Sequence, residues 1–101
     1  MAQRYDVVLE GQLGERRGTL VWTETDGQLT GTFTLFGLDN PVTGRRSGAA
    51  LELTHTLRTA VSLLRCRTHA ELCGGELRGT ITSGRSRIRF RGKKQTERTE
   101  V

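Results

Sequence analysis

The side chains best suited to chemistry in this sequence begin with its two histidines. His55 alternates with Leu53 and Leu57, so it falls on the apolar face of an extended segment. There it is either a polar group inside a ligand pocket, a general base, or a hydrogen-bonded histidine of the core. His69 lies in a polar stretch close to an expected turn, which predicts a solvated loop residue.

The two cysteines, Cys66 and Cys73, are seven positions apart. With only two histidines at irregular spacing they make no credible zinc site, so no metal is expected. A turn at residues 69–70 would pair the two thiols across a hairpin, where they could bridge. A turn at residues 74–75, where two glycines stand, would keep them apart. We expect the second arrangement, with both thiols buried and reduced.

No other group of residues predicts catalysis. Residues 11–14 contain two glycines but precede no helix, so they form a turn and not a phosphate-binding loop. No serine lies in a nucleophile elbow, and the carboxylates are scattered. We therefore expect a protein that is not an enzyme, with no catalytic residues and no cofactor.

The elements that must position these side chains have a period of two. Apolar residues or glycine alternate with polar residues over 29–35, 51–57 and 85–91, which is typical of half-buried strands. Turn signals such as Asp26-Gly27 separate these runs. The predicted strands cover 4–11, 17–24, 28–36, 41–45, 49–57, 60–70, 75–82 and 86–92. A helix over 56–72 is the competing interpretation, because that stretch lacks glycine and proline.

The fold class predicted is all-β, an antiparallel up-and-down meander closing into a small barrel of about eight strands over residues 1–92. A polar, flexible tail is expected over 93–101. Gly31 and Gly79 occur in similar stretches, and two such kinks would help to curl the sheet. Closure would place the basic last strand beside Asp6 and Glu10. The predicted interior is Tyr5, Val7, Leu9, Leu20, Trp22, Leu29, Phe33, Leu35, Leu51, Leu53, Leu57, Leu77, Ile81, Ile88 and Phe90.

Residues 18–33 resemble the second and third strands of the avidin/streptavidin family, in which a patterned strand, an Asn/Asp-Gly turn and Leu-Thr-Gly-Thr with an aromatic residue follow one another. Residues 42–45 resemble that family's next strand. The resemblance covers about a third of the chain and implies an eight-stranded calycin-type barrel. Biotin binding does not carry over, because the chain has one tryptophan, Trp22, and has Phe33 and Thr34 where the family has Tyr-x-Ser.

The composition of the chain limits the classes of partner that we expect. The chain has 101 residues, a net charge of +5 and a hydrophobic share of 34%, which fit one small basic domain. No apolar run is long enough to span a membrane, and residues 1–6 show no signal-peptide pattern. We therefore expect a cytoplasmic protein without a membrane partner.

The leading functional hypothesis is binding of a small apolar or amphipathic ligand at the barrel mouth. Its candidate residues are the inward aromatic and histidine side chains Tyr5, Trp22, Phe33 and His55. Two alternatives remain. A structural module is one of them, since avidin-like barrels associate through their walls and outward Val8, Val21, Phe36, Leu38 and Leu64 would serve a homodimer or homotetramer.

The other alternative is binding of nucleic acid or another polyanion through a basic stripe. It is less favoured, because the aromatic residues alternate inward and carboxylates lie on the neighbouring strand. The residues of this stripe are Arg85, Arg87, Arg89, Arg91, Lys93 and Lys94.

Overall fold

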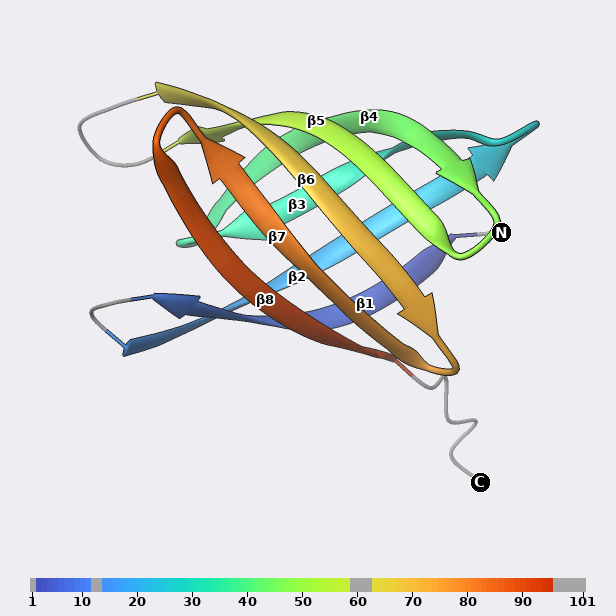
Figure 1. The fold of residues 1–101 in the computed structure, drawn as a ribbon, viewed down its shortest axis with the longest axis horizontal. Coiled ribbons are helices and arrows are strands. Elements are labelled where there is room, and N and C mark those ends of the chain that lie inside the picture. Colours follow the sequence, from blue (N-terminus) through green and yellow to red (C-terminus); the bar gives the residue numbers. More distant parts are fainter. Residues whose placement is uncertain (1, 12–13, 59–62, 96–101) are drawn as a thin grey trace.

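A computed structural model describes residues 2–11, 14–58 and 63–95 of the chain. These residues form eight antiparallel strands, each paired with the next in sequence, and β8 pairs with β1 to close the barrel (Figure 1). The strands are β1 (Gln3–Gly11), β2 (Gly14–Thr25), β3 (Gln28–Leu35), β4 (Leu38–Ser47), β5 (Ala50–Arg58), β6 (Leu63–Cys73), β7 (Glu76–Ser83) and β8 (Ser86–Lys94). The predicted closed meander is confirmed.

The barrel has two ends, which differ in the connections they carry. One end, here called the Phe36 rim, joins β1 to β2, β3 to β4, β5 to β6 and β7 to β8 (left in Figure 1). The opposite end, the Tyr5 rim, joins β2 to β3, β4 to β5 and β6 to β7. Because consecutive strands run in opposite directions, the connections between them fall alternately at the two rims.

The interior is the apolar set predicted from the alternation, with one exception. Ile88 is only partly buried, whereas the other fourteen predicted residues are buried. The structure also buries Cys66, as expected, and adds further buried side chains that the sequence pattern had not singled out as interior, namely Asn40, Val42, Thr68 and Ala70.

Glycines within the strands let neighbouring backbones approach closely. A Cβ atom on Gly31 would lie 1.9 Å from the Val21 carbonyl oxygen, and one on Gly79 would lie 2.3 Å from that of His69. Such contacts are impossible for any residue with a side chain. The two related glycines therefore lie where neighbouring strands approach closely, as expected for a strand that bends to close a small barrel.

The β1–β8 seam, formed by the pairing of the first and last strands, closes the sheet. Leu9 lies opposite Phe90 inside the barrel, and Asp6 lies opposite Lys93 outside it. Strand β8 continues through Lys94, two residues beyond the expected end of the barrel. The rest of the expected tail, from residue 96 onward, lies outside the described residues.

Three local predictions concern strand β6 and the turn that follows it. The turn at residues 74–75 is confirmed, but Cys73 is exposed and only Cys66 is buried, so the prediction of two buried thiols was wrong. The helical alternative is wrong over 63–72, which lies in β6. His69 is exposed as expected, but it lies within β6 rather than in a loop and contacts the Glu52 carboxylate on β5.

Candidate ligand site at the Tyr5 rim

The four candidate ligand residues are all buried, but they form two separate pairs. Tyr5 and Trp22 stack with ring centroids 5.0 Å apart and an interplanar angle of 5°. Phe33 and His55 contact each other at 5.3 Å, tilted by 50°. The first pair lines a hollow at the Tyr5 rim, and the second pair does not. The four residues therefore do not line one common site, contrary to the expectation from the sequence.

His55 has the environment of a core histidine. Its Nε2 lies 2.7 Å from the Thr68 hydroxyl, and its Nδ1 lies 3.3 Å from the Thr56 carbonyl oxygen. The carbonyl can only accept, so Nδ1 carries the proton and Nε2 accepts from the hydroxyl. Burial lowers the pKa of His55, and the bond to Thr56 opposes this only in part. A neutral, fully hydrogen-bonded ring is expected at neutral pH, with no free group for a ligand.

Trp22 differs from His55 in its hydrogen bonding. Its side chain is 1% exposed, and its Nε1–H is the buried side-chain polar atom without a hydrogen-bond partner in the described chain. Leaving a buried donor unsatisfied costs about 1–3 kcal/mol, so such a group calls for an explanation. One explanation is a bound molecule whose acceptor atom would pair with this N–H group.

The hollow beside Trp22 has a volume of about 430 Å³, which lies within the usual range for small-molecule sites. The aromatic pair from β1 and β2 contributes rings, and the surrounding hairpins contribute polar groups and backbone. Its lining residues are Gln3, Tyr5, Trp22, Arg46, Gly48, Ala49, Leu72, Gly74 and Lys94.

The charged and polar groups of this hollow are mostly donors. Arg46 donates to Glu24 at 3.1 Å and to the Gly48 carbonyl at 2.9 Å. Lys94 forms no ion pair with any residue that the structure describes. Burial raises the pKa of Tyr5, and the nearby Arg46 guanidinium opposes that rise, so the phenol keeps its proton at neutral pH. Together these groups favour a ligand that carries acceptors or negative charge.

Backbone hydrogen bonds hold this rim in shape. The amides of Arg46, Leu72 and Lys94 each donate at 2.8 Å, to the carbonyls of Gly27, Ala49 and Gly75 respectively. Each bond links a strand to a neighbouring hairpin at the same end of the barrel. The hollow is therefore pre-formed, which lowers the entropic cost of binding.

The predicted basic stripe does not form one continuous surface. Arg87, Arg89, Arg91 and Lys93 face outward on β8, whereas Arg85 lies in the β7–β8 turn and Lys94 lines the hollow at the Tyr5 rim. Arg91 binds the carboxylates of Glu10 and Glu15, the latter at 3.0 Å. Its charge is compensated, as the expected acidic neighbour on β1 implied.

The sequence reasoning missed two arginines that extend the uncompensated part of this surface. Arg67 of β6 lies opposite Thr82, which in turn lies opposite Arg87, and Arg65 precedes it on the same face. The signal for them was the alternation Arg65-Cys66-Arg67, which places both arginines outside once Cys66 is inside.

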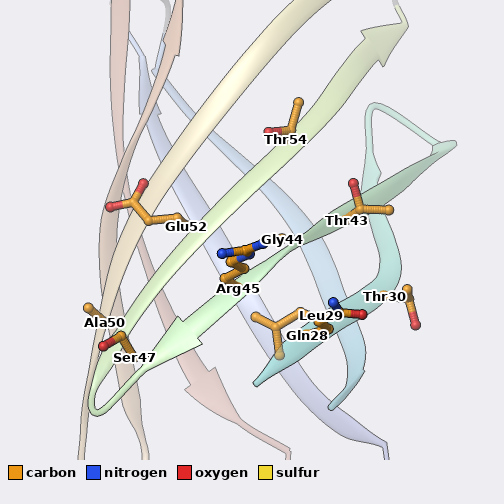
Figure 2. A pocket seen from close by; sticks show the side chains of 10 residues that line it. All are labelled: Gln28, Leu29, Thr30, Thr43, Gly44, Arg45, Ser47, Ala50, Glu52 and Thr54. Carbon is orange, nitrogen blue, oxygen red and sulfur yellow. The ribbon is translucent and has the colours of Figure 1, made fainter. Parts of the chain in front are cut away.

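A larger hollow of about 710 Å³ lies on the outer wall over β3, β4 and β5 (Figure 2). Thr30, Thr43 and Thr54 line it with hydroxyl groups, and Arg45 lies to one side of them (Figure 2). The Glu52 carboxylate at its edge is already bound to His69. Unlike the hollow at the Tyr5 rim, it is lined by no buried polar side chain that lacks a hydrogen-bond partner in the described chain.

Among the residues that the structure describes, no three His, Cys, Asp or Glu side chains are grouped to hold a metal ion. The same part of the chain contains no helix long and apolar enough to cross a membrane.

Comparison with known proteins adds no identity. No family model matches this sequence, and no curated protein matches it.

Proposed function

We propose that this protein is a non-enzymatic binding protein that takes a small amphipathic ligand at the Tyr5 rim. The observation that carries this proposal is the buried Nε1–H of Trp22, which has no partner in the described chain and belongs to a residue that lines an open hollow. An acceptor atom of the ligand would satisfy that donor. The candidate pair Tyr5 and Trp22 remains in the proposed site, whereas Phe33 and His55 act as core residues behind it.

The charge of the hollow narrows the ligand class. Lys94 has no carboxylate partner in the described chain, and it shares the hollow with Trp22 and with the phenol of Tyr5. A carboxylate or similar anionic group could accept hydrogen bonds from these donors. The flat Tyr5–Trp22 pair and Leu72 offer apolar contact to the rest of the molecule. A small aromatic or short aliphatic carboxylate meets both requirements.

A fluorescence titration tests this proposal, because Trp22 is the only tryptophan in the chain. Small aromatic and aliphatic carboxylates should change its emission at lower concentration than the matching neutral amides and alcohols. Lys94→Gln should weaken carboxylate binding by roughly 10- to 150-fold, since hydrogen bonds to charged groups contribute about 1.5–3 kcal/mol.

Lys93→Gln is the matched control, because Lys93 is the adjacent residue and faces outward toward Asp6 and Glu76. It removes the same charge and should leave carboxylate affinity nearly unchanged. Equal weakening by both variants, or no emission change with any carboxylate at millimolar concentration, would count against a site at the Tyr5 rim.

A further inference from the structure

The opposite end of the barrel, the Phe36 rim, carries exposed apolar side chains. Phe36 is 47% exposed and Leu38 39% at the β3–β4 hairpin, while Leu63 is 63% and Leu64 42% exposed at the start of β6. The two groups lie at the same end of the barrel, at the start of β4 and of β6, with β5 between these strands (Figure 1). Val8 and Val21 on the wall are half-buried by contrast, so the exposed apolar surface belongs to the rim.

Phe36 is held in an unfavourable backbone conformation. Its φ is +55°, in the left-handed region that bulky residues rarely adopt. The other Xaa-Gly hairpin of this kind, at the Tyr5 rim, uses Asp26 at φ +51°, a residue type that tolerates this region. The buried Asn40 side chain donates to the carbonyls of Phe33 and Leu38 at 3.0 and 3.2 Å and holds the hairpin in place. An exposed phenylalanine in this conformation is unfavourable for folding, which points to a function for its ring.

Arginines without carboxylate partners lie next to these apolar residues. Arg65 directly follows Leu64, and its carbonyl accepts a hydrogen bond of 3.1 Å from Ser83, which fixes it beside the β7–β8 turn. That turn carries Arg85, and Arg87 and Arg67 lie on the adjoining wall. None of these four guanidiniums is in an ion pair with the described chain.

The carboxylates near this rim do not compensate that charge. Glu10 and Glu15 are bound to Arg91, and Asp39 accepts a hydrogen bond of 2.7 Å from Thr34 on the far side of the apolar residues. The Phe36 rim therefore combines apolar side chains at its edge with uncompensated positive charge beside them.

We propose that the Phe36 rim docks on an anionic phospholipid bilayer. Phe36, Leu63 and Leu64 would enter the interfacial layer while the neighbouring arginines contact lipid phosphates. From the sequence we expected no membrane partner, because no segment is long enough to span a bilayer. Docking on the membrane surface needs no such segment. This site is at the other end of the barrel from the proposed ligand hollow, and neither depends on the other.

Two other occupants fit the rim less well. A second copy of the chain, packed rim to rim about a two-fold axis, would bring two sets of uncompensated arginines together. A nucleic acid would use the arginines, but the exposed leucines would contribute nothing to phosphate or base recognition, and Phe36 alone could stack. Of these three occupants, a membrane surface is the one that would use both the apolar and the basic groups.

Co-sedimentation with vesicles tests the proposal. We expect the protein to bind vesicles of phosphatidylcholine with one quarter phosphatidylglycerol, to bind pure phosphatidylcholine far more weakly, and to dissociate as salt rises. Phe36→Asn should weaken binding about tenfold, as expected for loss of a partly inserted ring. Because asparagine adopts positive φ readily, this variant should fold at least as stably as the parent. Arg65→Gln with Arg87→Gln should weaken binding roughly 25-fold, at about fivefold per arginine.

The matched control is Arg4→Gln with Arg45→Gln, which removes the same charge from exposed positions away from the Phe36 rim. It should weaken vesicle binding by less than threefold. An equal loss in both double variants would show attraction by net charge alone and would overturn the proposal. So would a dimer in sedimentation velocity that Phe36→Asn dissociates, or binding to a 20-nucleotide single strand that is tighter than vesicle binding and indifferent to Phe36→Asn.

Discussion

Two polar side chains inside the barrel, His55 and Trp22, differ in whether their hydrogen bonds are made. His55 has a partner for each ring nitrogen, whereas the single donor of Trp22 has none among the residues that the structure describes. Alternation placed both on inward positions, but it could not show this difference. The partners of His55 come from Thr68 on the next strand and from the adjacent backbone, so they depend on register and not on the local pattern.

The buried environment of His55 predicts how stability depends on pH. Its pKa in the folded protein is lowered below the ordinary value of 6.5, so below that pH the unfolded chain binds more protons. The stability from this residue is therefore present above about pH 6.5 and decreases as the pH falls toward the lowered pKa. Urea unfolding at pH 7.5 and pH 5 should show a larger loss of stability for the parent than for His55→Gln. Parallel pH dependence in the two proteins would disprove this assignment.

At the scale of strands, the closely approached glycines determine how the sheet coils. Gly31 was recognisable from its position two residues after an inward leucine, as was Gly79 in the related stretch. Their distances to the neighbouring carbonyls were not, because these depend on the strand-to-strand approach. Pattern and turn residues sufficed for the existence of most strands. The exposure of Cys73 follows from alternation once β6 is known to run through it, because the odd interval of seven residues places it on the face opposite to buried Cys66.

Substitution of Gly31 tests this role. Gly31→Ala should lower the free energy of unfolding by about 1–3 kcal/mol or more, because the new methyl group meets the Val21 carbonyl at 1.9 Å. Gly75→Ala is the control, since a Cβ there has nothing within 4 Å. It should change stability by no more than about 0.5 kcal/mol in urea titrations. Similar losses in the two variants would mean that the close approach does not constrain the sheet.

For the whole molecule, closure explains how a chain with a 34% hydrophobic share folds as one domain. Each strand supplies one face to a common interior, and no long sheet edge is left unpaired. Charge complementarity at the β1–β8 seam was the sequence argument for closure, and Arg91 does contact Glu10. The distribution of the remaining charge between the two rims could not be foreseen, because it depends on which arginines from β6 and β8 become neighbours.

Burial, rather than charge, should account for most of the stability of that seam. Leu9→Ala should lower the free energy of unfolding by about 2–5 kcal/mol, because Leu9 is 2% exposed and lies opposite Phe90. Glu10→Gln, at the next position, should have only a small effect that shrinks further in salt, because its carboxylate is exposed and Arg91 keeps Glu15. Urea titrations of both variants at 0.05 and 0.5 M salt measure this difference. A loss from Glu10→Gln as large as that from Leu9→Ala would mean that ion pairing, and not the shared core, holds the first and last strands together.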